Sequence, residues 1–345
     1  MFTRLSLILI LGLLTAACAP RYRGPVTNHF NGKKFVNTGP PAERKGGLLK
    51  WLLHRDKGPW LDNPDAQPGP KPAPRIMGDS LVVTFVGHSS FLLQTDGLNI
   101  LTDPVWSARV GPTKWLGIKR RRPPGLRYED LPPIDVVLLS HCHYDHLDLG
   151  TLRRLAKDFN PQMVTPLGVS YLPKKAGGNA TRELDWNDRL QVLPNLAVTA
   201  TEARHFSNRG MGDRDRTLWA GYLLHTRFGT VYFAGDTGYG NLFPNIARKA
   251  ADSETGQIKL AMLPIGSYRP TWFMAPVHMS PVDAVQAFND LGRPQSIGIH
   301  FGTFQQGDDG LFEPEQDLTR ELLKQKIPLQ RFTVPLEGKA MVFKK

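Results

Sequence analysis

Short apolar runs separated by Gly, Pro and polar residues dominate the chain after residue 80. Runs of this length with such boundaries are typical of β-strands, whereas apolar residues at helical spacing indicate amphipathic helices. Asp148 and Ser280 stand where they can cap such helices. We expect strands near 81–86, 91–95, 98–102, 136–139, 162–165, 190–193, 196–201, 218–225, 230–234 and 296–300, and helices near 149–159, 281–291 and 314–326. This alternation favours an α/β fold in which two mixed β-sheets pack face to face with helices outside.

The first 80 residues have a different pattern. Residues 1–17 hold one arginine and then a short apolar run, which predicts a signal peptide because the run is too short for a confident membrane span. Small residues before Cys18 resemble a bacterial lipoprotein cleavage site, so we predict lipidation of Cys18; a plain signal peptide cut near Ala17 is the alternative. Residues 18–80 are rich in Pro, Gly and basic side chains and are predicted to form a lipid-anchored tether and wrapping arm with little regular structure. Its one apolar patch, 48–53, could dock onto the core or a bilayer.

The formal net charge of +12 indicates that the protein could bind an anionic partner. The densest basic run, residues 119–122, lies in a long Pro-rich insertion at 104–133 that we expect to be functional. A basic face would attract anionic lipid headgroups. A nucleic-acid surface is the rival, but an exported, lipid-anchored protein seldom meets nucleic acid, so we expect a membrane surface and no nucleic acid. A solvated loop explains this run equally well.

The strand at 136–139 leads into four potential metal ligands within six residues, namely His141, His143, Asp145 and His146. Three histidines so close together would repel one another when protonated, and a metal ion removes this problem because it binds the neutral rings. Imidazole and carboxylate groups are ligands that zinc accepts. This loop is therefore predicted to bind metal. Cys142 lies inside it and is expected to face away from the metals.

Three further candidate ligands follow apolar strand-like runs downstream. They are His205, Asp236 and His300, and each stands where a predicted strand gives way to a Gly-rich or polar loop. One polar residue at a strand end is weak support for a site. Together with the first four, however, these residues offer enough donors for two metal ions.

These motifs resemble the metallo-β-lactamase superfamily from about Leu81 to the C-terminus. They are most similar to its N-acyl-phosphatidylethanolamine phospholipase D branch and the bacterial relatives of that branch. The branch-level segments lie at 86–90, 101–106, 131–135, 234–239, 264–268, 272–274 and 300–304. The resemblance implies that residues 81–345 form a hydrolase domain with the αββα sandwich of the superfamily. It also implies two zinc ions, one held by His141, His143 and His205, the other by Asp145, His146 and His300, with Asp236 bridging both.

The same resemblance implies a di-zinc phosphodiesterase of phospholipase D type in a bacterial cell envelope. A hydroxide held between the metals would attack phosphorus in N-acyl-phosphatidylethanolamine-like lipids and release N-acylethanolamine and phosphatidic acid. The metal ligands alone do not distinguish this from hydrolysis of a lactone, a β-lactam or a soluble phosphodiester. A non-catalytic metal-binding scaffold is a third reading, and a homodimer is a candidate assembly.

The resemblance also assigns roles around the metals. Asp103 would lie beside them and accept the second ring proton of a ligating histidine, although a simple turn before Pro104 explains it too. With Asp145, Asp236 and His278, Asp103 completes the expected catalytic set.

The expected substrate contacts are Tyr144 and His278. Tyr268 and Trp272 belong to an aromatic-rich loop that could line an acyl groove or form an ordinary apolar cluster. His88 is expected to be a buried, hydrogen-bonded histidine without a ligand role.

Overall fold

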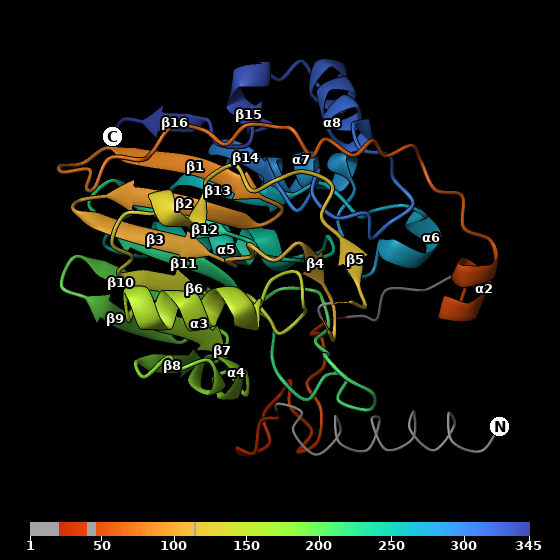
Figure 1. The fold of residues 1–345 in the computed structure, drawn as a ribbon, viewed down its shortest axis with the longest axis horizontal. Coiled ribbons are helices and arrows are strands. Elements are labelled where there is room, and N and C mark those ends of the chain that lie inside the picture. The colour runs from red at the N-terminus through yellow and green to blue at the C-terminus, as the bar shows by residue number, and fades with distance from the viewer. Residues whose placement is uncertain (1–20, 40–45, 114) are drawn as a thin grey trace.

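Two seven-stranded sheets stacked face to face form the centre of the molecule (Figure 1). The computed structural model describes residues 21–39, 46–113 and 115–345. Each sheet is mixed in the same way, because one half pairs antiparallel and the other half parallel. The predicted αββα sandwich is therefore confirmed.

The first sheet has the order β16-β1-β2-β3-β6-β7-β8. Its three antiparallel junctions run from β16 to β3, and its three parallel junctions run from β3 to β8. Its strands are β1 (Leu81–Gly87), β2 (Ser90–Thr95), β3 (Leu98–Thr102), β6 (Val136–Leu138), β7 (Gln162–Pro166), β8 (Thr181–Leu184) and β16 (Ala340–Phe343).

The second sheet has the order β15-β14-β13-β12-β11-β10-β9. Here the parallel half runs from β15 to β12 and the antiparallel half from β12 to β9. Its strands are β9 (Arg189–Leu193), β10 (Leu196–Thr201), β11 (Gly221–Thr226), β12 (Gly229–Phe233), β13 (Ile258–Pro264), β14 (Gln295–Ile299) and β15 (Phe332–Thr333).

Alternation along β6 shows how one apolar strand serves two layers. Val136 and Leu138 belong to the large core between the sheets, whereas Val137 packs in a second core with Leu152 and Leu155 of the helix outside. This follows from side chains that point to opposite faces of a strand. A continuous apolar run is thus explained by burial on both faces.

Helices cover both outer faces, with α3 in front of the sheets and α5 behind them in Figure 1. The Asp148 side chain caps α3 by accepting a hydrogen bond from Gly150 N–H, and Ser280 begins α7 with a capping box, both as predicted. The helices are α3 (Leu149–Asp158), α4 (Tyr171–Lys175), α5 (Leu242–Ala251), α6 (Thr271–Met274), α7 (Pro281–Asp290) and α8 (Glu313–Lys324), with 3-10 turns at Tyr128–Asp130 and Leu329–Arg331.

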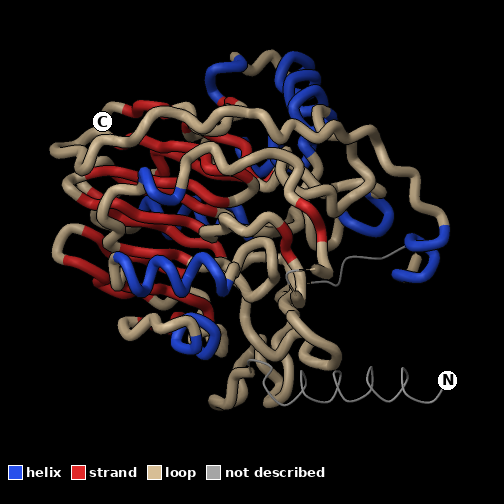
Figure 2. Tube along the Cα trace, viewed as in Figure 1, coloured by secondary structure: helices blue, strands red, loops and turns tan. Residues whose placement is uncertain are grey.

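The arm before β1 lies against the body of the protein. It runs from the bottom of Figure 1 past α2 (Leu48–Leu53) and over the top to β1, and Figure 2 shows it almost entirely as loop. Phe30 and Phe35 are buried in the large core, so its first part is fastened by burial. The apolar patch at 48–53 forms a helix with no buried residue. The predicted signal peptide and Cys18 lie outside the described residues.

The basic run at 119–122 connects distant segments. Lys119 and Arg121 both pair with Asp62 of the arm, and Arg122 pairs with Glu337 near the C-terminus. Arg120 is buried and donates to the carbonyl groups of Val105 and Ser107. These contacts hold the insertion 104–133, whose short hairpin consists of β4 (Arg109–Val110) and β5 (Ile118–Lys119).

Close backbone approach fixes a second junction. Gly69 of the arm donates its N–H to the carbonyl of Gly125 in the insertion, and a Cβ at either glycine would collide with Gly338. Among the described residues, no helix has the length and apolar character that crossing a membrane requires.

Candidate metal centre

Loops at the ends of strands from both sheets deliver the seven predicted ligands to one place. The loop after β6 carries the first four, while His205, Asp236 and His300 follow β10, β12 and β14 of the other sheet. The structure brings all seven into contact, and nearly all of them are buried.

Three histidines form the first group of donors. His141 Nε2 lies 2.7 Å from His143 Nδ1, which lies 3.2 Å from His205 Nε2. The outer nitrogens of two rings face oxygens that can only accept: His205 Nδ1 donates to the carbonyl of Val277 (2.9 Å), and His143 Nε2 donates to Asn208 Oδ1 (3.0 Å). The inner nitrogens of these two rings are therefore unprotonated and repel each other unless a cation lies between them.

The second group combines two histidines with two carboxylates. His146 Nε2 lies 3.0 Å from Asp145 Oδ2, and His300 Nε2 lies 3.0 Å from Asp236 Oδ2. The atoms His146 Nε2, His300 Nε2 and Asp236 Oδ1 are buried without a hydrogen-bond partner among the described residues. Buried polar atoms are rarely left unpaired, so this group also fits a bound cation.

Asp236 links the two groups. Its Oδ2 lies 3.3 Å from His146 Nε2 and 3.7 Å from His205 Nε2. This is the placement expected of a bridging carboxylate, and the donor set of nitrogens and oxygens suits divalent transition metals. The residues present therefore fit a metal pair.

Electrostatics separate the two groups. Burial and the neighbouring imidazoles hold the pKa of His141 and His205 well below the usual range, and burial lowers the pKa of His143 to about 4. These rings are neutral and ready to bind a metal at pH 7. At His300 burial acts in the same direction, but Asp236 and Asp145 outweigh it and raise the pKa to about 9. The second group thus requires positive charge, supplied by protons or by a cation.

Asp103 makes the contact expected of it. Its Oδ2 accepts from His146 Nδ1 (2.7 Å) and from the Ser140 hydroxyl (2.6 Å), and its Oδ1 accepts from Ser140 N–H (2.7 Å). A carboxylate so placed fixes the tautomer of His146 with Nε2 free to bind a metal.

His88 lies closer to the centre than its sequence context indicated. It is buried and hydrogen-bonded, as expected, but its partner is Asp145 (Nε2 to Oδ2, 2.9 Å), and its carbonyl accepts from His300 N–H (2.9 Å). The Gly-His turn after β1 was its only sequence signal. The structure adds His88 to the groups that hold Asp145 in place.

Among the described residues, four of the ten non-glycine residues with positive φ lie at this site. His88 (φ 61°), Asp103 (φ 34°), Ser267 (φ 58°) and His300 (φ 60°) all have left-handed conformations. Such conformations cost roughly 1–3 kcal/mol each and cluster at functional sites. Here they turn side chains inward where strands end.

A cavity of about 260 Å³ opens beside the two groups of donors and is lined by His143, Asp145 and Asp236 among others. Tyr144 and His278, the expected substrate contacts, also line it. The Tyr144 hydroxyl donates to the carbonyl of Arg209, and the Arg209 guanidinium lies over the Tyr144 ring, 4.0 Å from its centroid, so a ligand can meet only the ring's edge or its other face. His278 Nδ1 is buried without a hydrogen bond among the described residues and lies 3.9 Å from Asp236 Oδ2.

The structure does not bring Tyr268 and Trp272 to this cavity. They line a separate one of about 520 Å³, in which the Tyr268 hydroxyl donates to Asp317. Their neighbour Phe273 stacks on Trp51 of α2, with ring centroids 4.9 Å apart. The segment thus lies outside the cavity at the metal donors, and a role of Tyr268 and Trp272 in binding an acyl chain stays a prediction.

Other supporting residues had no signal in the sequence. Cys142 is buried in the outer core beside Ser207, away from the ligands, as expected. Asn37 of the arm was not anticipated: its side chain accepts from His205 N–H (3.1 Å) and donates to the His205 carbonyl (2.9 Å). An amide in an irregular segment carries no pattern that could have revealed this contact.

Comparison with known proteins agrees with this site. A family model described as the β-lactamase superfamily domain matches residues 98–301, which is more than half of the chain. The chain belongs to the metallo-β-lactamase superfamily. Among solved structures, this metallo-β-lactamase domain is similar to an isothiocyanate hydrolase from Delia radicum gut bacteria, with a TM-score of 0.60 and 19% identity over 76% of this chain and 100% of that one. At this identity the likeness shows the fold alone.

Sequence relatives are closer. N-acyl-phosphatidylethanolamine-hydrolyzing phospholipase D 1 of Caenorhabditis elegans is 35% identical over 253 residues, which is 70% of each chain. An uncharacterised protein of Mycobacterium tuberculosis is 37% identical over 326 residues, covering 90% of this chain and 83% of the relative. The predicted branch of the superfamily is confirmed, and the chain is a metal-dependent hydrolase by family.

Proposed function

We propose that this hydrolase is a di-zinc phosphodiesterase of phospholipase D type acting on N-acyl-phosphatidylethanolamine-like phospholipids. The observation that carries the proposal is the pair of donor groups joined by Asp236 beside a cavity. Two cations there would supply a water that is nucleophilic at neutral pH and neutralise the charge of a phosphodiester. The name of the C. elegans relative supports the choice of lipid.

The chain's own residues position that chemistry. Asp103 fixes His146, and His88 fixes Asp145, so the second group keeps its geometry when substrate arrives. Burial lowers the pKa of His278 to about 3, so its ring is neutral at pH 7. With Nδ1 unpaired at the cavity, His278 is placed to hydrogen-bond a phosphoryl oxygen or a leaving alcohol.

A substrate panel tests the proposal. Zinc-loaded protein, with its metal content measured on the same sample, is incubated with N-acyl-phosphatidylethanolamine, a soluble bis-aryl phosphodiester, a lactone and a β-lactam. We expect the lipid to be cleaved fastest and its products to be phosphatidic acid and N-acylethanolamine. Cleavage of neither phosphodiester by metal-replete protein would defeat the proposal, and a faster lactone or β-lactam reaction would replace it.

A variant distinguishes binding at His278 from metal binding. In His278→Gln we expect hydrolysis of the lipid to fall about 100-fold while the metal content stays unchanged, because loss of one positioned hydrogen-bond donor at a charged oxygen typically costs about this much. A matched change, His54→Gln, removes an exposed histidine far along the arm and should leave the rate as it is. Full activity of His278→Gln would remove this residue from the mechanism.

A further inference from the structure

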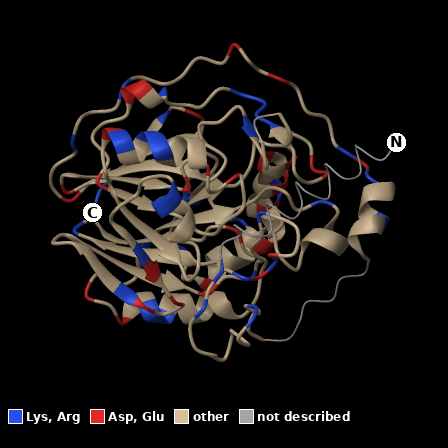
Figure 3. Ribbon diagram, turned by 60° about the horizontal axis from the view of Figure 1, so that its bottom comes forward, with Lys and Arg blue, Asp and Glu red and all other residues tan. Residues whose placement is uncertain are grey.

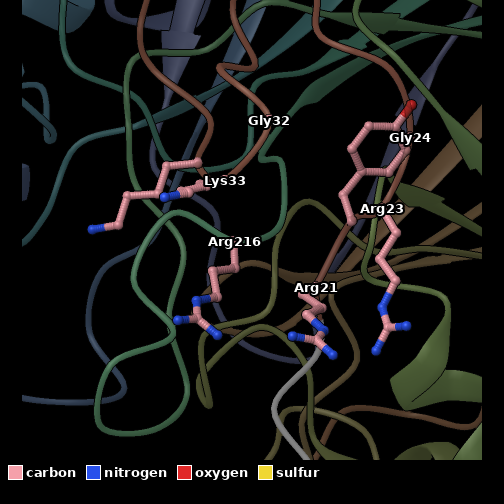
Figure 4. A pocket seen from close by; sticks show the side chains of 8 residues that line it. Arg21, Arg23, Gly24, Gly32, Lys33 and Arg216 are labelled. Atoms are coloured by element: carbon pink, nitrogen blue, oxygen red, sulfur yellow. The ribbon is translucent and has the colours of Figure 1, made fainter.

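A third cavity, of about 550 Å³, lies where the arm meets the segment between β10 and β11, which also carries His205. Five cationic side chains line it, and Figure 4 shows most of them, with three guanidinium groups on the same side of the pocket. None of the five forms an ion pair within the described part of the chain. They are Arg21, Arg23, Lys33, Lys34 and Arg216.

Packing of Tyr22 fixes the backbone from which the exposed side chains of Arg21 and Arg23 extend. Tyr22 stands between them, and its N–H donates to the carbonyl of Arg216 (2.8 Å). The Tyr22 ring packs against Phe30 and Phe35, with ring centroids 5.0 and 5.5 Å apart. Because Tyr22 is held on both its backbone and its ring, Arg21 and Arg23 project from an anchored segment.

A tight hairpin places the two lysines. Asn31 Oδ1 accepts the N–H groups of both Lys33 (3.0 Å) and Lys34 (2.9 Å), and Phe30 bridges to Phe35 at the base of the turn. These two hydrogen bonds to the Asn31 side chain stabilise the turn. The two lysines are exposed at its tip, outside the hydrophobic core. The cations of the cavity therefore come from three backbone segments held in fixed relation.

Carboxylates near this cavity have other partners. Asp185, which acts electrostatically on Tyr22, accepts from His29 Nε2 at 2.7 Å. Asp215, next to Arg216, pairs with Arg214 at 3.4 Å. Elsewhere basic and acidic residues are interspersed along the chain (Figure 3), and the densest basic run, at 119–122, is occupied by Asp62, Glu337 and backbone carbonyls. Glu183 and Asp188 also act electrostatically on Tyr22, but they do not line the cavity. The lining thus carries five cations and no carboxylate.

We propose that this cavity binds the phosphate-bearing headgroup of an anionic phospholipid and so orients the enzyme on a lipid surface. Five cations that repel one another are stabilised by a multiply charged anion, and Arg and Lys together suit phosphate oxygens. Cys18, the predicted lipidation site, precedes Arg21 by only three residues in the sequence, so the same membrane would meet both. Binding here does not depend on the proposed hydrolysis, because it needs neither metal nor the cavity at His278.

Vesicle binding by the full chain tests the proposal. Binding to phosphatidylcholine vesicles is compared with binding to vesicles holding about one-third phosphatidylglycerol, at about 0.1 M salt. The ratio of the two affinities measures how much of the binding depends on the charge of the lipid, because apolar contacts with the bilayer contribute to both affinities. We expect Lys33→Gln/Lys34→Gln to lower this ratio about 25-fold, roughly fivefold for each cation removed. Arg21→Gln/Arg23→Gln should act similarly.

The matched control is Lys344→Gln/Lys345→Gln, which removes two adjacent exposed lysines at the C-terminus, on the other side of the molecule in Figure 1. It carries the same change in net charge and should lower the ratio less than about threefold. Thermal melting confirms that all three variants fold. An equal loss in the pocket and control variants, or no preference of the unmodified chain for anionic vesicles, would overturn the proposal.

Two further binding experiments distinguish a lipid headgroup from other phosphate-bearing ligands. Inorganic phosphate or a single-stranded oligonucleotide is titrated into the protein in place of vesicles. Binding of either that depends on the cavity lysines, without vesicle binding, would overturn the lipid assignment. Vesicle binding that depends on the cavity lysines, with no binding of the oligonucleotide and none of phosphate at millimolar concentration, would support it.

Discussion

Three of the histidines that serve as metal donors have a hydrogen-bond partner on their outer ring nitrogen that fixes their tautomer. Val277 and Asn208 take the outer protons of His205 and His143, and Asp103 takes that of His146. The inner nitrogens of His143 and His205 are thereby left as lone pairs that a cation can accept, whereas the inner nitrogen of His146 holds a proton until a cation replaces it. At the scale of single residues, the site is therefore arranged for cations before any arrive.

Asp103→Asn should reveal how much that arrangement contributes. We expect metal affinity to fall about 10- to 100-fold, because His146 loses the carboxylate that fixes its tautomer and makes it more basic. Competition with a chromophoric chelator measures this directly. Asp283→Asn is the control, since Asp283 belongs to the capping box of α7 and does not contact the donors. Unchanged affinity in Asp103→Asn would mean that Asp103 serves only the turn before Pro104.

At the scale of elements, the arm is part of the site. Asn37 bonds both backbone groups of His205 and accepts from Trp219 Nε1 (3.1 Å). Its side chain thus pairs the N–H and the carbonyl of His205, as the backbone of a neighbouring strand would. The arm thus fixes one ligand of the first donor group, although it lies far from that ligand in the sequence.

Asn37→Ala should weaken metal binding as well as folding. The loss leaves the N–H and carbonyl of His205 unpaired, which costs roughly 1–3 kcal/mol for each buried group. We expect a lower melting temperature and a smaller rise in that temperature on adding zinc, measured by calorimetry. Asn31→Ala, which disturbs the hairpin of the same arm, should lower stability without changing the response to zinc. Equal zinc responses in both variants would contradict this role of Asn37.

Sequence could predict the strands and the ligands at their ends, because apolar runs and polar turn residues are local signals. It did not indicate helix α5, with Pro244 in its sequence, nor the apolar strand β13, which lies in the parallel half of the second sheet. The contact between Asn37 and His205 spans 168 positions and has no periodicity to indicate it. The second role of His88, against Asp145, is likewise visible only once β1 and the loop after β6 lie side by side. What could not be predicted is the set of partners that tertiary packing brings together.

At the scale of the whole molecule, the donors connect the two sheets. Those from His141 to His146 follow β6 of the first sheet, whereas His205, Asp236 and His300 follow strands of the second. A cation shared between them cross-links the two halves of the sandwich. Because metal binds the folded state, it stabilises that state by mass action.

The melting temperature should therefore rise with zinc, and the rise should grow from pH 6 to pH 8. Without metal, Asp236 and Asp145 hold a proton on His300, whose pKa is raised to about 9, and zinc must displace it. Below that pKa each displaced proton costs about tenfold in affinity per pH unit. Calorimetry at three pH values with saturating chelator as reference measures the effect. Asp236→Asn, which lacks the shared carboxylate, should show a much smaller rise, and a rise independent of pH would contradict proton displacement.

The attachment of the arm has a geometric consequence. Phe30 and Phe35 are buried in the core, and Asn37 forms hydrogen bonds with the backbone of His205. This part of the arm is therefore fixed to the domain and is not a flexible linker. If the arm binds a surface, the distance and the angle between that surface and the cavity at the metal donors are therefore fixed. Lengthening the chain ahead of Arg21 would change where the protein can travel but not how its pocket faces that surface.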